Sequence, residues 1–195
     1  MLELLHYDHE VYRKFIHITS SIIAIILWIE GREILLPYIL SAAIIFPSLD
    51  YLRRHFLTLQ KLYYKIFGIV TRPHENNKLS GASWVFIGSA VTIVLFNEKV
   101  AIISLLTMSL SDSAAAIIGI GYGRTKLFNK SLEGSSAFFI TSSIIIFSLS
   151  PALFIVNIIA VLISTIIELF STPTLNDNLF IPVATGIILT IGGVV

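Results

Sequence analysis

The hydrophobic pattern of this chain consists of long apolar runs separated by short polar segments. A helix needs about 17–25 mostly apolar residues to cross the hydrocarbon layer of a membrane. Seven runs approach this length, and each predicts a membrane-spanning helix: residues 11–29, 34–50, 79–96, 100–118, 135–150, 151–167 and 179–195. The pattern therefore predicts an all-α integral membrane protein, a bundle of about seven transmembrane helices in one domain over residues 1–195.

The connection between the second and third predicted spans has a helical periodicity of its own. Its apolar residues recur at helical spacing at Leu52, Phe56, Leu59, Tyr63, Ile66 and Phe67. Bases occupy the other faces, so we predict an amphipathic helix in the headgroup layer, where anionic lipid or an anionic nucleotide would be attracted. Just before it, Asp50 precedes Arg53 and Arg54 by one helical turn, which predicts a local ion pair.

Composition and charge extend this interpretation. The chain is 55% hydrophobic and only 13% charged, whereas soluble domains carry roughly 25% charged residues. Cysteine is absent, which excludes disulfides, thiolate metal sites and a cysteine nucleophile. If the N-terminus is cytoplasmic, only Arg32 and Lys99 of the 13 Lys and Arg residues lie outside. The connections 51–79, 119–134 and 168–178 then form a cytoplasmic active face.

Asp112 is the polar residue least expected from the hydrophobic pattern, because it lies within the fourth predicted span. A carboxylate at this depth costs several kcal/mol unless it is paired, hydrated or metal-bound. We therefore expect Asp112 to face the bundle interior or a wet cavity. Ala115, Gly119 and Gly123 follow it at steps of four, which is also the pattern of close helix packing. Packing alone leaves Asp112 unexplained.

Glycines and bases follow Asp112 in the segment "GIGYGRTKLFNKSLEG". Glycine lets the backbone turn and present N–H groups to an anion, and neighbouring bases suit a polyphosphate. The predicted phosphate ligands here are Gly119, Gly121, Gly123, Arg124, Lys126, Lys130, Ser131 and Gly134. Two alternatives stay open: cytoplasmic anchoring for the bases, and a first-turn acid that complements a helix dipole for Glu133. No GxxxxGK[ST] motif is present, so a Walker A loop is excluded.

The first span begins with three further candidates, Arg13, Lys14 and His17. The two bases are predicted phosphate ligands, and they are also the residues expected at a cytoplasmic membrane surface. His17 at the start of an apolar span suggests a phosphate contact or proton transfer, with a satisfied interfacial histidine as the alternative.

The remaining candidates lie before the third span and between the sixth and seventh spans. They are Arg72 as a phosphate ligand, with Glu75, Lys78, Glu168, Asp177 and Asn178 as metal-binding or supporting residues. Asp and Asn at 176–178 are also the preferred N-cap residues of a helix. The carboxylates of Asp112, Glu133 and Asp177 converge on the predicted cytoplasmic face and predict a Mg²⁺ site there.

Together these motifs resemble the CTP-dependent lipid kinase family: dolichol kinase, phytol kinase and the CTP-using diacylglycerol kinases, distant relatives of the phosphatidate cytidylyltransferases. The resemblance runs from an "RKxxH" start through an "RxxE…SGA" approach to the third span. Its core is "DxxAxxxGxxxG(R/K)xK…KSxEG", and it ends in "E…DN…P". The matching residues are Arg13, Lys14, His17, Arg72, Glu75, Ser80, Gly81, Ala82, Asp112, Ala115, Gly119, Gly123, Arg124, Lys126, Lys130, Ser131, Glu133, Gly134, Glu168, Asp177, Asn178 and Pro182.

The resemblance implies that the γ-phosphate of CTP passes to the hydroxyl of an isoprenoid alcohol, such as a dolichol, polyprenol or geranylgeraniol-like lipid. CDP and a lipid monophosphate would form at the cytoplasmic membrane face. Asp112, Glu133 and His17 are then the catalytic candidates, CTP the donor and Mg²⁺ the metal. Membrane lipids are expected partners, a homodimer is compatible with the small-residue stripes, and no nucleic acid is expected.

Two alternatives to the kinase remain. One is a cytidylyltransferase that makes a CDP-activated lipid from CTP and a phosphatidate-like substrate. The other is a small membrane transporter, which predicts polar residues near the middle of several spans. Only Asp112 lies well inside a predicted span, and the other polar residues gather on one face. This distribution favours an enzyme.

Overall fold

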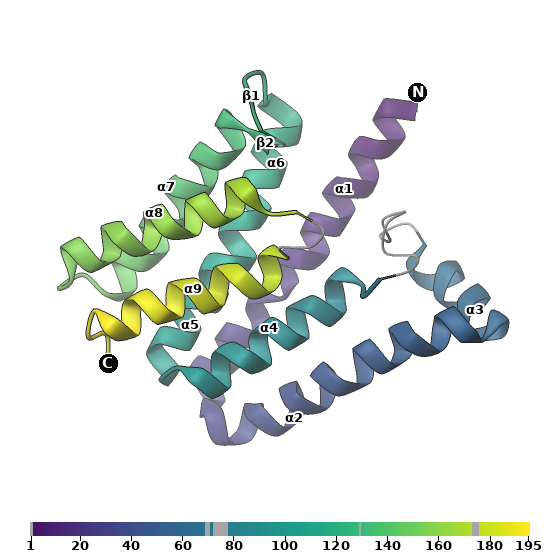
Figure 1. The fold of residues 1–195 in the computed structure, drawn as a ribbon, viewed down its shortest axis with the longest axis horizontal. Coiled ribbons are helices and arrows are strands. Elements are labelled where there is room, and N and C mark those ends of the chain that lie inside the picture. The colour runs from purple at the N-terminus through teal and green to yellow at the C-terminus, as the bar shows by residue number, and fades with distance from the viewer. Residues whose placement is uncertain (1, 69–70, 72–77, 129, 173–175) are drawn as a thin grey trace.

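The computed structural model describes residues 2–68, 71, 78–128, 130–172 and 176–195, with side chains from residue 10 onward. Helices dominate it, which confirms the all-α prediction (Figure 1). The helices are α1 (Leu2–Thr19), α2 (Ser21–His55), α3 (Leu57–Phe67), α4 (Gly81–Leu95), α5 (Glu98–Leu106), α6 (Asp112–Tyr122), α7 (Leu132–Leu149), α8 (Phe154–Phe170) and α9 (Asp177–Ile191). A π-helical turn, Thr107–Ser111, joins α5 to α6, and a short antiparallel pair, β1 (Lys126–Leu127) and β2 (Lys130–Ser131), precedes α7.

Two continuous helical stretches in the described part are long and apolar enough to cross a membrane, Glu98–Tyr122 and Leu132–Leu149. The helices Gly81–Leu95, Phe154–Phe170 and Asp177–Ile191 are apolar but shorter. The arrangement with seven spans therefore stays a prediction.

The N-terminal half differs from the predicted boundaries. The predicted span 11–29 is divided at Ser20, between α1 and α2. The predicted turn after it is a break inside α2, where Gly31 adopts φ +78°, a conformation that favours glycine. The predicted amphipathic run is also divided: its first part continues α2 as far as His55, and α3 begins only after the extended residue Phe56. No residue of α3 is buried.

The connections gather at two opposite sides of the bundle. Figure 1 shows the N-terminus, α3 and the β1–β2 hairpin on one side, and the α4–α5 turn, the α7–α8 turn and the C-terminus on the other. On this second side, the Arg32 backbone N–H donates to Glu98 Oε2 at 3.1 Å. The Asn97 side chain donates to the Val194 carbonyl at 2.9 Å. Among the described residues, the bases Lys61 and Lys65 of α3 and Lys126 and Lys130 of the hairpin belong to elements on the first side.

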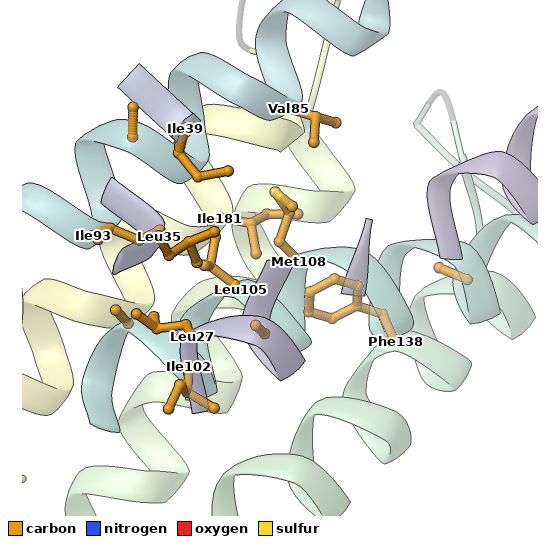
Figure 2. Packing of buried hydrophobic residues seen from close by; sticks show 14 residues of the cluster. Leu27, Leu35, Ile39, Val85, Ile93, Ile102, Leu105, Met108, Phe138 and Ile181 are labelled. Atoms are coloured by element: carbon orange, nitrogen blue, oxygen red, sulfur yellow. The ribbon is translucent and has the colours of Figure 1, made fainter. Parts of the chain in front are cut away.

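The larger apolar core joins six helices, α2, α4, α5, α6, α7 and α9 (Figure 2). Its residues include Leu27, Leu35 and Ile39 of α2, Val85 and Ile93 of α4, Ile102 and Leu105 of α5, Met108 of the π-helical turn, Phe138 of α7 and Ile181 of α9. Helices α4 and α9 cross at Gly88, where a Cβ would collide with the Asn178 carbonyl oxygen. This crossing sets the start of α9 beside α4 and so determines part of the site described next.

Candidate active site

One large cavity, of about 1330 Å³, is lined by bases of the connections, among them Lys78, Lys126 and Lys130. Helices α1, α3, α4 and α6 contribute to its wall, together with the start of α2, the β1–β2 hairpin, the start of α7, the end of α8 and the start of α9. The cavity is larger than the roughly 300–1,000 Å³ typical of pockets for small ligands. Most of the candidate residues line it.

Asp112 lies at the wall of this cavity, where α1 packs against α6. Its Oδ2 accepts a hydrogen bond from the Lys14 ammonium group, and His17 Nε2 lies 3.4 Å from the same oxygen. Asp112 is only 2% exposed and Lys14 only 6%. Asp112 is the first residue after the π-helical turn, an irregularity often found at functional sites. The expected interior position of this carboxylate is therefore what the structure shows.

Lys130 is held by a second buried carboxylate. Its Nζ lies 2.9 Å from Glu168 Oε1, and Ser135 Oγ donates to Glu168 Oε2 at 3.0 Å. Burial lowers the pKa of the lysine ammonium, but the carboxylates of Glu168, Asp112 and Asp177 raise it more, and the pKa lies above its ordinary value. Lys130 thus stays charged at neutral pH and faces the cavity from a fixed position.

Three helices start at this cavity. Ser80 caps α4 by accepting from the Ser83 N–H at 3.4 Å, Ser131 caps α7 by accepting from the Gly134 N–H at 3.1 Å, and Asn176 caps α9 by accepting from the Asn178 N–H at 3.1 Å. All three caps line the cavity wall. Helix N-termini carry partial positive charge and bind anions. With the lysines they make this end of the cavity suitable for phosphate groups.

The glycine segment differs from its prediction. Gly119 and Gly121 lie within α6, and the Gly123 N–H donates to the Gly119 carbonyl at 3.1 Å, so these amides serve the helix and do not form an open phosphate loop. A Cβ on Gly123 would lie 2.8 Å from Ser131 Oγ, and one on Gly134 would lie 2.7 Å from the Ala115 carbonyl. The small residues therefore let α6 and α7 approach closely, as in the packing interpretation.

Several other predicted residues also line the cavity. Arg13 does so while paired with Glu10 at 2.7 Å. Lys126, Lys78, Asp177 and Asn178 line it as well.

A smaller number of the predicted site residues do not line the cavity. Glu133, Arg124 and Gly121 are not part of the cavity wall. Glu133 instead accepts from the Thr125 backbone N–H at 3.1 Å, which ties the hairpin segment to the start of α7 and leaves the carboxylate away from Asp112. Arg72 and Glu75 fall outside the described residues.

Asp50 has a wider role than the predicted local ion pair. Arg53 Nε does donate to its Oδ1 at 2.8 Å. Its Oδ2 also accepts from the Ser80 N–H at 2.7 Å and from Ser83 Oγ at 2.5 Å, which fixes the start of α4 to the end of α2. Neither serine was predicted to contact this carboxylate, because they lie about thirty residues further along and local spacing gives no signal.

A preformed metal site is not evident in the described residues: no three His, Cys, Asp or Glu side chains there lie close enough to hold an ion. The cavity does contain carboxylates, however, with Asp112 and Asp177 both on its wall. Mg²⁺ is commonly held by one or two carboxylates together with substrate phosphates. The donor set therefore fits Mg²⁺ only in company with a bound phosphate.

The fold and the cavity define a helical protein with two helical stretches long and apolar enough to cross a membrane, and with a basic site that contains buried carboxylates. No protein-family profile matches the chain, and no solved structure matches it. An uncharacterized protein of Rickettsia prowazekii is 32% identical over 189 residues, 91% of this chain and 92% of the relative. An uncharacterized protein of Methanocaldococcus jannaschii is 30% identical over 184 residues, 92% of each. The chain belongs to the same family as these two proteins.

Relatives with a stated activity match a shorter region. CTP-dependent diacylglycerol kinase 1 of Saccharomyces cerevisiae is 34% identical over 137 residues, 67% of this chain and 47% of the kinase. The Eremothecium gossypii protein of the same name is 31% identical over 142 residues, 70% of this chain and 44% of the kinase. The chain thus matches about half the length of these kinases. It is a homologue of CTP-dependent lipid kinases, which agrees with the resemblance found in its motifs.

Proposed function

We propose that this protein is a CTP-dependent lipid kinase that transfers the γ-phosphate of CTP to the hydroxyl of a lipid alcohol. The observation that carries the proposal is a single cavity that contains the buried Asp112 cluster, Lys130 and three helix N-termini. The homology of the chain with CTP-dependent diacylglycerol kinases supports CTP as the phosphate donor. The names of these relatives favour diacylglycerol as the acceptor, while an isoprenoid alcohol stays the acceptor predicted from the motifs.

Phosphate binding is assigned to the basic end of the cavity. Phosphoryl transfer depends mostly on positioning and on neutralising the charge of the phosphates. Lys126 and Lys130 approach from the hairpin, and the starts of α4, α7 and α9 add positive ends. Mg²⁺ would be held by Asp112 and Asp177 together with the phosphates, and it would supply further charge neutralisation. Glu133 is assigned to holding the hairpin segment, since its carboxylate binds the Thr125 N–H.

Asp112 is the proposed acceptor of the hydroxyl proton. The alcohol oxygen attacks the γ-phosphorus, the bond from that phosphorus to the β–γ bridging oxygen breaks, and CDP leaves with the electron pair. The hydroxyl proton passes to the Asp112 carboxylate, and His17, 3.4 Å from Asp112 Oδ2, is placed to carry it onward. Lys14 keeps the carboxylate charged and oriented between turnovers.

The test uses detergent-purified protein with Mg²⁺, CTP labelled at either the α- or the γ-phosphate, and a panel of acceptors. The panel contains diacylglycerol, geranylgeraniol, phytol, a polyprenol and phosphatidate. We expect γ-label in the lipid fraction, and the alcohol that accepts it identifies the substrate. α-Label in lipid would show a cytidylyltransferase, and no label in either form from folded protein would favour the transporter.

A further inference from the structure

We propose that the apolar part of the cavity, between α1, the start of α2 and α4, holds the hydrocarbon chain of the acceptor alcohol. This acceptor groove is formed by Ile16, Ile22, Ile23, Trp84, Val85 and Phe86. The inference rests on the proposed kinase function, because it assigns the second substrate of the same site. It adds the path by which a lipid reaches Asp112, and that path is open to specific tests.

The groove is continuous with the polar end of the cavity. Ile16 immediately precedes His17 on α1, and both line the same cavity as Asp112. Thr19 and Ser20, between His17 and Ile22, line the same cavity, so a chain lying along this wall leads directly to the Asp112 cluster. A hydroxyl at the end of that chain would arrive where the bases hold the phosphates.

The exposure of the wall changes from rim to floor. Ile16 is 56% exposed and Ile22 51%, whereas Val85 is 8% exposed. Exposed isoleucines at the rim suit contact with bilayer hydrocarbon, and the buried floor suits a chain removed from it. A lipid chain can therefore slide from the membrane into the groove without crossing water.

The hydroxyl groups of Thr19 and Ser20 on this wall already donate their protons to backbone carbonyls. Thr19 Oγ1 donates to the Ile16 carbonyl at 2.6 Å, and Ser20 Oγ donates to the His17 carbonyl at 2.6 Å. Neither hydroxyl therefore has a proton left to donate to a ligand in this arrangement. The wall is a poor site for the base and ribose of a nucleotide, which need polar partners, and a good site for hydrocarbon.

A matched pair of tryptophan substitutions on α2 tests the groove. Ile23→Trp fills it, while Ile25→Trp adds the same volume to a residue that is 44% exposed and does not line the cavity. We expect Ile23→Trp to lower kcat/KM for the long-chain acceptor by about tenfold or more, the scale of steric discrimination in apolar pockets. The KM for CTP and the rate with a short-chain analogue of the same alcohol should stay unchanged, and Ile25→Trp should behave as wild type.

Trp84 supplies a measurement of binding that does not depend on turnover. The chain has two tryptophans, and Trp28 is 66% exposed and lies outside the cavity wall. In a Trp28→Phe variant, a brominated long-chain alcohol should quench Trp84 fluorescence saturably, and the unbrominated alcohol should reverse the quenching. In the reciprocal Trp84→Phe variant, quenching of Trp28 should rise linearly with the brominated lipid.

The two measurements separate failure of the groove from failure of the kinase. Phosphate transfer by wild type, combined with no saturable quenching and no effect of Ile23→Trp, would overturn the groove and leave the kinase intact. Saturable quenching without any phosphate transfer would support a lipid-chain site and overturn the kinase. An equal loss of kcat/KM in Ile23→Trp and Ile25→Trp would also count against the groove. So would a loss in Ile23→Trp that is the same for long-chain and short-chain acceptors.

Discussion

Asp112 is a buried acid whose neighbours are a buried lysine and a histidine, and this setting determines what its replacement does. Asp112→Asn should abolish phosphate transfer. It should also destabilise the fold, because it leaves the Lys14 ammonium buried without its counter-charge, a loss of about 3–5 kcal/mol. The measurements are the transfer assay and thermal unfolding in detergent.

The double variant Asp112→Asn with Lys14→Met separates stability from chemistry. Removing both charges should restore much of the melting temperature, because no unpaired ion remains. Phosphate transfer should stay absent. Recovery of activity in the double variant would show that Asp112 serves only to neutralise Lys14.

Lys130 should bind phosphate as a permanent cation. Lys130→Met should raise the KM for CTP about tenfold or more, and Lys130→Arg should restore part of the loss. Because Glu168 and other carboxylates raise its pKa, the ammonium is fully charged below its ordinary pKa and loses its proton only as the pH rises through the higher folded value. The KM for CTP should therefore not rise between pH 7 and pH 9 through this residue. A rise in wild type that Lys130→Arg removes would contradict the assignment.

At the scale of elements, the contact of α6 with α7 depends on residues without side chains. Gly123→Ala places a Cβ in collision with the Gly119 carbonyl oxygen and 2.8 Å from the Ser131 side chain, so the end of α6 and its contact with α7 must shift, at a cost of about 1–3 kcal/mol. We expect a melting temperature lower by several degrees and a higher KM for CTP, since Ser131 caps α7 at the cavity. Gly121→Ala is the matched control, because Gly121 is an exposed residue of α6 outside the cavity wall. Equal effects of the two substitutions would argue against close packing at Gly123.

Hydrophobic periodicity predicted the helices well, but not how they begin and end. The division of the first span at Ser20 and the continuation of α2 to His55 were not predicted. Runs of apolar residues reveal that a helix is present, whereas its ends depend on caps and neighbours. Asp50 illustrates this: its hydrogen bond to the Ser80 N–H comes from another helix and fixes where α4 starts.

For the whole molecule, the distribution of charge predicts that the cavity faces the cytoplasm. The natural absence of cysteine allows this to be tested with single cysteines. Glu33→Cys and Lys61→Cys replace exposed residues. Glu33 follows Arg32, whose N–H contacts Glu98 at the start of α5, and Lys61 belongs to α3, on the opposite side of the bundle (Figure 1). An impermeant maleimide should label Glu33→Cys in intact cells, and Lys61→Cys only after the membrane is opened. The reverse labelling would show that the cavity faces outward.

The sequence by itself determined the helical class, the grouping of bases on one side and the need for Asp112 to be shielded. These properties follow from local periodicity and from the cost of burying charge, so neighbouring residues suffice to reveal them. The tertiary structure decided which residues meet. Lys14 and Asp112 form a pair although they are 98 residues apart in the sequence. Lys130 of the hairpin pairs with Glu168 of α8, and Glu133 accepts from the Thr125 backbone N–H. The acceptor groove likewise exists only because α1, the start of α2 and α4 line one cavity, and such pairings depend on how distant helices pack.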